Sequence, residues 1–235
     1  MAGTLYLVPN LLGVVAPEAA LPRRTIDVAR RLACWVVETP KAARAFLKSL
    51  DVPHRIADLE IAALPVEPGA PAIGNALEAL HRGRDVGLLS DAGCPGVADP
   101  GAVLVAAAHE RGLRVVPLVG PSAILLALMA SGMNGQRFCF HGYLPVKPDA
   151  RAAALRALER ESRADARTQL FIETPYRNAA LLRALAQTLA PRTRVCVAAD
   201  LTLASEEVAC RTASQWRRQD PGRFERRPAI FLLQA

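Results

Sequence analysis

The sequence lacks the glycine patterns that mark the commonest nucleotide-binding enzymes. No G-x-G-x-x-G follows the first strand-like segment, and no G-x-x-x-x-G-K-[ST] occurs anywhere in the 235 residues. The first absence argues against an ordinary Rossmann site for a dinucleotide, and the second argues against a P-loop enzyme. A G-x-S-x-G segment is also absent, which disfavours a serine hydrolase. Hydride transfer, phosphoryl transfer and serine hydrolysis are therefore poor explanations of this chain.

Residues that bind metal ions are few and scattered. The five cysteines include no C-x-x-C pair, and the four histidines lie at no metal-ligand spacing from a cysteine or an acid. We therefore expect no bound metal. Four cysteines lie in apolar, strand-like runs, where we expect free thiols that pack as small hydrophobic groups; these are Cys34, Cys139, Cys196 and Cys210. Cys94 differs, because it lies in a loop rich in glycine and proline.

Long apolar runs are missing as well. The longest, residues 124–130, is bounded by Pro121 and by Ser131-Gly132, and it is far shorter than the roughly 20 residues of a membrane-spanning helix. Residues 1–9 lack the basic start and apolar stretch of a secretory signal. Because 51% of the residues are nevertheless apolar, the chain can bury a substantial core. We expect a soluble, cytoplasmic protein with no membrane partner.

Acidic residues are too few to balance the basic ones, and the imbalance lies in one half of the chain. Residues 1–117 contain 12 Lys and Arg against 12 Asp and Glu, whereas residues 118–235 contain 17 against 10. Nearly all the excess is arginine, which suits phosphate and carboxylate groups. An anionic substrate explains this excess, and a basic face that is simply solvated explains it equally well. The last stretch is the most crowded, with Arg192, Arg194, Arg211, Arg217, Arg218, Arg223, Arg226 and Arg227.

Short β-branched runs alternate with helix-like stretches, which predicts an α/β fold. In the first half we expect strands at residues 4–8, 34–38, 86–90 and 115–119, and helices at 41–50, 71–80 and 99–110. In the second half we expect strands at residues 138–143, 168–172, 194–198, 206–211 and 229–233, and helices at 150–160 and 177–189. Residues 119–122 predict a turn between two domains, 1–118 and 119–235. Residues 213–228 carry little apolar surface and give the weakest prediction.

A loop with three glycines and two prolines is the most informative segment. It follows the apolar strand near residues 86–90 and leads into a helix that we expect Asp99 to cap. Ligands of open α/β sheets bind outside the carboxyl ends of the strands, and glycine lets the backbone approach a ligand closely. The helix start adds unpaired N–H groups that suit an anion. The segment therefore predicts a ligand loop, although a structural turn has the same composition.

A second group of polar residues follows another strand, at Glu173-Thr174-Pro175-Tyr176-Arg177. Glu173 is placed to accept hydrogen bonds from a hydroxyl or amine of a ligand, and Arg177 to clamp an anion. An ion pair at a helix start is the structural alternative. Glu38-Thr39-Pro40-Lys41 repeats this order of strand, acid and proline in the first half.

Taken together, these segments resemble the ribose 2'-O-methyltransferases of small-subunit rRNA, a family of the tetrapyrrole-methylase superfamily. The resemblance is carried by SDAGCP at residues 90–95, DPG at 99–101, RVVPLVGPSA at 114–123, FCFHGYLP at 138–145 and ETPYR at 173–177. It extends through most of the chain in matching order and spacing. It implies two lobes, each a mixed sheet flanked by helices, with S-adenosylmethionine in the cleft between them and a homodimer as the usual assembly.

The same resemblance implies which residues contact the methyl donor, mostly through their main chains. They are Pro9, Asn10, Gly93, Cys94, Pro95, Val97, Ser122, Ala123, Leu201, Pro228 and Ala229, with Glu173 beside them. Methyl transfer to a hydroxyl mainly needs alignment of the reactants, and a base assists it. Glu38 and Glu173 are the candidate bases, and Arg177 is a further candidate for the catalytic group.

The chain also departs from that family, and the departures leave the methyl acceptor open. The family's first-strand loop of the type T-P-I-G-N-L is here VPNLLG at residues 8–13, and its E-D-T-R is here ETPK at 38–41. Family members often continue in a helical tail, whereas this sequence ends at Ala235. Three hypotheses remain: methylation of rRNA, methylation of a small anionic molecule such as a tetrapyrrole, and binding of the donor without catalysis.

Overall fold

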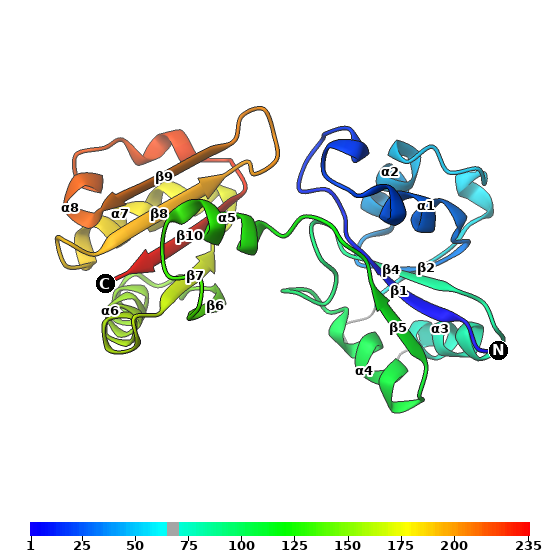
Figure 1. The fold of residues 1–235 in the computed structure, drawn as a ribbon. Coiled ribbons are helices and arrows are strands. Elements are labelled where there is room, and N and C mark those ends of the chain that lie inside the picture. The colour runs from blue at the N-terminus through cyan, green and yellow to red at the C-terminus, as the bar shows by residue number, and fades with distance from the viewer. Residues whose placement is uncertain (65–70) are drawn as a thin grey trace. The chain divides into compact units, whose positions relative to one another are not determined.

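The computed structural model describes residues 1–64 and 71–235, which form two compact units, Met1–Ser122 and Ala123–Ala235 (Figure 1). Each unit contains one five-stranded sheet with helices packed against it. The α/β class expected from the sequence is therefore confirmed. Within the described residues, no helix combines the length and apolar character needed to cross a membrane.

The sheet of the first unit has the strand order β3-β2-β4-β1-β5, and all its pairings are parallel, whereas a mixed sheet was expected here. Its strands are β1 (Thr4–Val8), β2 (Cys34–Val37), β3 (Glu60–Ala63), β4 (Val86–Leu89) and β5 (Arg114–Pro117). Its helices are α1 (Arg23–Arg31), α2 (Pro40–Ser49), α3 (Pro71–His81) and α4 (Ala102–Glu110). Because the strands are parallel and β1, β2 and β4 are neighbours, the loops that follow them meet at one edge of the sheet.

Helices cover both faces of this sheet, and the sequences of the strands show why. Strands β2 and β4 are buried at every position, as in parallel sheets that are covered on both sides. Trp35 packs in one core cluster with Ile26 of α1 and Phe46 of α2. Val36, the next residue of β2, packs in another cluster with the helices α3 and α4. Figure 1 shows the two helix pairs on opposite sides of the sheet.

The second unit has a mixed sheet with the strand order β6-β7-β10-β8-β9. Strands β6 and β7 are parallel, and the other neighbours are antiparallel. The strands are β6 (Phe138–Tyr143), β7 (Thr168–Ile172), β8 (Arg194–Ala199), β9 (Glu207–Thr212) and β10 (Ala229–Gln234). The helices are α5 (Ala123–Ser131), α6 (Pro148–Asp165), α7 (Asn178–Thr188) and the short α8 (Ala213–Trp216). Helices α6 and α7 share one core with the stacked rings of Phe171 and Phe231.

Residues 213–228 are ordered, and the expectation that they have little apolar surface to bury was wrong. They form α8, the 3-10 helix η4 (Pro221–Phe224) and the turn into β10. Trp216 and Phe224 are buried in the core of the second unit with their rings edge to face. Trp216 Nε1 also donates a hydrogen bond to Val195 O at 2.9 Å. Two large aromatic side chains therefore anchor a segment whose composition is otherwise polar.

The start of α4 differs from the sequence prediction. The helix begins at Ala102, and Gly101 rather than Asp99 occupies the N-cap position, so the capping role predicted for Asp99 is wrong. The Asp99 carboxylate instead accepts hydrogen bonds from Gly96 N at 2.8 Å and Gly101 N at 2.6 Å. It organises the loop that precedes the helix. The N–H groups expected to bind an external anion are therefore partly used by a side chain of the loop itself.

Two further expectations need correction. Helix α1 and strand β3 were not predicted, whereas the other strands of both sheets were found within two residues of their predicted bounds. Four cysteines were expected to be buried as small hydrophobic groups, and Cys34 and Cys196 are buried. The expectation is wrong for Cys210, which is exposed on β9, and Cys139 is only half-buried. Strand β9 lies at the edge of its sheet, so its side chains are less covered than those of the inner strands.

Candidate functional site

The loops that follow β1 and β4 are joined at Asn10 and Gly93. The Asn10 N–H donates to Gly93 O at 2.9 Å, and the Gly93 N–H donates back to Asn10 O at 3.2 Å. The buried Asn10 amide also donates from Nδ2 to the carbonyl oxygens of Ser90 and Asp91, both at 3.0 Å. Buried backbone groups of both loops are thereby satisfied. The two loops form one hydrogen-bonded surface at the carboxyl edge of the sheet.

The chain after β5 closes on the same surface. A Cβ atom added to Gly120 would lie 2.3 Å from Pro9 Cβ, so only glycine lets the backbone pass at this point. The Cys94 thiol donates a hydrogen bond to Pro121 O at 3.5 Å, and burial raises the pKa of this thiol. The first unit therefore brings together four of the residues expected to contact the donor, Pro9, Asn10, Gly93 and Cys94.

The backbone of residues 93–98 is held in conformations that favour glycine. Gly93 has φ +70°, Gly96 has φ +82° and the non-glycine Ala98 has φ +62°. A non-glycine residue in the left-handed region persists where its surroundings hold it there, and the Asp99 carboxylate that binds Gly96 N contributes to this. Pro95 is buried, whereas the apolar Val97 is 50% exposed at the tip of the loop. Ser122 ends the first unit and Ala123 begins α5.

Glu38, a candidate base, lies at the carboxyl end of β2 and is exposed. One of its oxygens, Oε2, accepts a hydrogen bond from Asp91 N at 2.9 Å. Asp91 reciprocates, since its carboxylate accepts from Thr39 N at 3.0 Å and from Thr39 Oγ1 at 2.6 Å. Glu38 therefore has a structural role in joining the ends of β2 and β4.

Glu173, the other candidate base, is buried where β7 ends, and its side chain is 1% exposed. Its Oε1 accepts hydrogen bonds from Thr174 N at 2.7 Å and from Arg177 Nε and Nη2 at 2.9 and 2.6 Å. The hydrogen bond with Glu173 raises the pKa of the Arg177 guanidinium. The other oxygen, Oε2, is buried and has no partner within the described part of the chain. A buried carboxylate oxygen without a donor is costly, and it is suited to receive a group from a ligand.

Leu201, Pro228 and Ala229 lie on two adjoining segments of the second unit. The Asp200 N–H donates to Pro228 O at 2.9 Å, and Ala199 pairs with Ala229 between β8 and β10. Leu201 and Ala229 are buried, whereas Pro228 is exposed. The structure thus brings these three predicted residues together within one unit.

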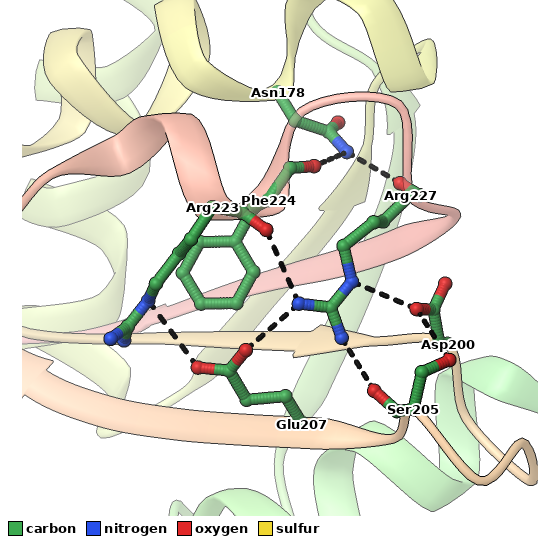
Figure 2. A network of polar contacts seen from close by, with 7 residues as sticks. All are labelled: Asn178, Asp200, Ser205, Glu207, Arg223, Phe224 and Arg227. Atoms are coloured by element: carbon green, nitrogen blue, oxygen red, sulfur yellow. Dashed lines mark hydrogen bonds and ion pairs between the residues drawn. The ribbon is translucent and has the colours of Figure 1, made fainter.

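The side chains that hold these segments were not predicted from the sequence. Figure 2 shows Arg227 between the loop after β8 and the start of β9, with Asn178 above it at the start of α7. The Asn178 Nδ2 group donates to Phe224 O at 3.0 Å and to Arg227 O at 2.7 Å. In the sequence, Asp200 is visible only as an acid after β8, and Arg227 only as an arginine before β10. Neither signal reveals that the two meet.

Several arginines of the crowded last stretch are used inside the fold. Arg217 donates to Ala186 O at 2.7 Å and to Leu189 O at 3.3 Å. Arg194 donates to Gly132 O at 3.1 Å and also to the Gln234 side chain. Arg218 and Arg226, by contrast, are exposed. The basic excess of this half is therefore partly structural, and part of it faces solvent.

Histidine, cysteine and acidic side chains do not gather into a metal site within residues 1–64 and 71–235. No group of three or more of them is placed there to hold an ion.

Known proteins of similar sequence are named as methyltransferases. The chain is 37% identical over 205 residues to ribosomal RNA small subunit methyltransferase I of Mesorhizobium japonicum, a match that covers 87% of this chain and 65% of that protein. It is 32% identical over 206 residues to the protein of the same name from Escherichia coli, with 88% and 68% covered. The chain thus spans about two thirds of the length of these relatives.

A solved structure with a similar fold and a matching family pattern agree with these two relatives. The crystal structure of the methyltransferase CobJ is similar with a TM-score of 0.64 at 20% identity, over 99% of this chain and 94% of that chain. The sequence pattern of the tetrapyrrole (corrin/porphyrin) methylases matches residues 21–215, which is most of the chain. With both its sequence and its fold in agreement, the chain belongs to the tetrapyrrole (corrin/porphyrin) methylase family.

Proposed function

We propose that this chain is an S-adenosylmethionine-dependent methyltransferase that methylates a ribose 2'-hydroxyl of ribosomal RNA. The observation that carries the proposal is the identity of 37% and 32% with two relatives named as small-subunit rRNA methyltransferases, over most of this chain. The basic excess of residues 118–235 supports a polyanionic acceptor.

The residues present fit the methyl donor in their chemistry. The loops at Asn10 and Gly93 are rigidly bonded to each other, so they offer a preformed backbone surface. Thr202 Oγ1 is a buried atom without a partner in the described residues, and it can bond to a hydroxyl or amino group of the donor. The donor contacts that we propose are Pro9, Asn10, Gly93, Cys94, Pro95, Val97, Ser122, Ala123, Leu201, Pro228 and Ala229.

When bound, the donor supplies a methyl group that its sulfonium already activates. Transfer of that group to an acceptor hydroxyl would release the hydroxyl proton, which a residue of this chain must accept. We assign that proton to Glu173 Oε2, because Oε1 is engaged by Thr174 and Arg177 while Oε2 has no partner. Arg177 then acts as a positioning residue that orients the Glu173 carboxylate. Glu38 is the weaker candidate, because it is exposed and accepts from Asp91 N.

Calorimetry tests the donor part of the proposal. We expect the full chain to bind S-adenosylmethionine and S-adenosylhomocysteine, one molecule per chain. Absence of binding to both would contradict every enzymatic role that we propose. Binding without methylation of any acceptor would instead favour a protein that has kept the donor site and lost catalysis.

Mass spectrometry of rRNA tests the acceptor part. Small-subunit rRNA from cells with and without this protein is digested, and its nucleosides and fragments are compared. We expect one ribose methylation to be absent from the deletion strain and to return when the chain is expressed again. Unchanged rRNA, together with an absorbing macrocycle that co-purifies with the protein, would favour a small anionic acceptor of the tetrapyrrole type.

We further propose that the protein is a cytoplasmic homodimer. Large apolar side chains that are exposed on the second unit support this proposal, since a protein contact would cover them; they include Phe138, Tyr143, Val146 and Tyr176. Light scattering of the purified protein measures the mass directly. A mass of one chain at micromolar concentration would contradict the dimer.

A further inference from the structure

One side chain, Arg227, joins three parts of the second unit. Its Nε donates to Asp200 Oδ2 at 2.8 Å, and its Nη1 donates to Glu207 Oε2 at 2.8 Å and to Arg223 O at 3.2 Å. Its Nη2 donates to Ser205 O at 2.6 Å. Figure 2 shows the guanidinium between the two carboxylates, with the Ser205 carbonyl on a third side. The planar fork of arginine makes such simultaneous contacts possible, and lysine cannot reproduce them.

The segments joined by Arg227 have unusual backbone conformations. Asp200 has φ +50°, Thr202 has φ +73° and Arg226 has φ +62°. These are half of the six non-glycine residues with positive φ in the described chain. Such conformations are unfavourable for residues other than glycine, and they persist where their surroundings determine them. The loop after β8 and the turn before β10 are therefore held in place by contacts rather than by their own preference.

Further contacts bind the same segments to each other and to the 3-10 helix η3 (Pro175–Arg177). The Asp200 N–H donates to Pro228 O at 2.9 Å, and the Arg226 N–H donates to Pro175 O at 2.9 Å. Within the loop after β8, the Ser205 hydroxyl donates to Asp200 Oδ2 at 2.9 Å. The Asp200 side chain is only 11% exposed and the Arg227 side chain 21% exposed. Removing the arginine would leave the Asp200 carboxylate without the counter-charge that a partly buried charge needs, whereas Glu207 would keep its ion pair with Arg223.

We infer that Arg227 is a positioning residue that fixes the backbone of Leu201 and Pro228 in the conformation that binds the methyl donor. The inference rests on the proposed function, because these residues are donor contacts only in that proposal. Leu201 lies between two of the strained residues, and Pro228 directly follows Arg227. Thr202 Oγ1, buried and without a partner in the described residues, lies in the same loop. Loss of Arg227 frees both segments to leave these conformations.

The test measures the affinity of the full-length chain for S-adenosylhomocysteine, with Arg227→Gln and Arg227→Lys as variants. Both should weaken binding about 10- to 100-fold, the size of effect expected when hydrogen bonds to a charged group are lost. The KM for the donor should rise, while kcat at saturating donor stays within about twofold, which is the signature of lost binding rather than lost chemistry. A purely structural role would lower the unfolding temperature without this separation.

Arg223→Gln is the matched control. Its guanidinium contacts Glu207 Oε1 at 3.3 Å from the same turn, but it has no contact with Asp200 among the described residues. We expect its donor affinity to remain close to that of the unmodified chain. Asp200→Asn, which keeps an oxygen for Ser205 but removes the charge, provides a second variant should Arg227→Gln fail to fold, and it too should weaken donor binding.

The outcomes separate the inference from the proposed function. If the unmodified chain binds neither S-adenosylmethionine nor S-adenosylhomocysteine, the proposed function fails, and the inference fails with it. If the unmodified chain binds and the folded Arg227 and Asp200 variants bind equally well, only the inference is overturned. Equal losses in Arg227→Gln and Arg223→Gln would also overturn it. Weaker binding of RNA with unchanged donor binding would assign Arg227 to the acceptor instead.

Discussion

Cys196 and Cys210 have different environments, although both lie in apolar, strand-like runs of the sequence. Cys196 on β8 and Cys210 on β9 are direct partners across the antiparallel pair, so their side chains lie on the same face. Cys196 is fully buried, whereas Cys210 is exposed. The hydrogen bond from Cys196 lowers the pKa of the Cys210 thiol to about 7, and the nearby charge of Arg194 acts in the same direction. Cys196 itself has a raised pKa because of the same hydrogen bond and its burial.

Cys210 should consequently be the most reactive thiol of the protein near neutral pH. Because the thiolate is the nucleophile, the rate of alkylation by iodoacetamide should rise with pH and reach half of its maximum at about pH 7. Cys196→Ala should move this midpoint upward, toward the ordinary cysteine value of about 8.5. Mass spectrometry of peptides after timed alkylation measures the rates, with Cys34, whose pKa burial raises, as a slow internal reference. Equal rates at Cys210 and Cys34 would contradict the assignment.

Glu173 provides the sharpest test of the chemistry. Glu173→Gln keeps the size of the side chain and one oxygen, but it removes the ability to accept a proton. If Glu173 is the base, kcat for rRNA methylation should fall by about 10²- to 10⁴-fold, with little change in affinity for S-adenosylhomocysteine. Single-turnover methylation and calorimetry on the same preparation provide both values.

The control for this variant is another carboxylate paired with arginine in the same unit. Asp165 forms an exposed ion pair with Arg167, so Asp165→Asn removes an equivalent charge at the surface. Its kcat should be unchanged. A Glu173→Gln enzyme that keeps its kcat within a few-fold would show that no base is needed at this position and that Glu173 has a structural role with Arg177.

At the scale of elements, the start of α4 depends on the loop before it. Asp99→Ala removes the carboxylate that accepts from Gly96 N and Gly101 N, and we expect it to lower the free energy of unfolding by about 1–3 kcal/mol. Asp99→Asn, which keeps one acceptor oxygen, should lower it less. Chemical denaturation monitored by circular dichroism measures the difference. Equal stability of the alanine variant and the unmodified chain would show that the loop does not depend on this side chain.

The elements that could be predicted are those with a strong local pattern. Continuous apolar runs identified β2 and β4, because a strand buried on both faces must be apolar throughout. Helix α1 was missed because it is rich in arginine and buries a narrow stripe of four residues. Strand β3 was missed because it lies at the edge of the sheet, where none of its residues is fully buried. Local patterns are weakest where burial is partial.

The candidate site was predictable to a similar extent. Glycine and proline mark the loop at residues 90–101 in the sequence itself, and the acid at the end of β7 is equally visible. The role of Arg227 was not, because its partners Asp200 and Glu207 are distant in sequence and meet only when β8, β9 and β10 pair. The false N-cap at Asp99 has a related cause, since the same residue type caps helices and binds backbone N–H groups inside loops.

The whole molecule has two units with separate hydrophobic cores and unequal charge. None of the described core clusters includes residues from both units. Residues 118–235 carry the basic excess of the chain. Some of those arginines are bonded within the fold, as Arg217 and Arg227 are, while others such as Arg218 and Arg226 are exposed. Exposed arginines are the ones available to phosphate groups.

Salt dependence therefore separates an RNA acceptor from a small one. If the exposed arginines of residues 118–235 contact about six phosphates, affinity for small-subunit rRNA fragments should fall roughly a thousandfold between 50 and 200 mM salt. Binding of S-adenosylhomocysteine by the same protein should change little, because it does not depend on many phosphate contacts. Replacing Arg218 and Arg226 together by Gln should reduce the slope of log affinity against log salt by about 1.4 to 1.8 if both contact phosphate. Filter binding across a salt series measures these slopes. If the affinity for rRNA does not change with salt, the exposed arginines do not recognise the acceptor, and the proposed donor site is unaffected.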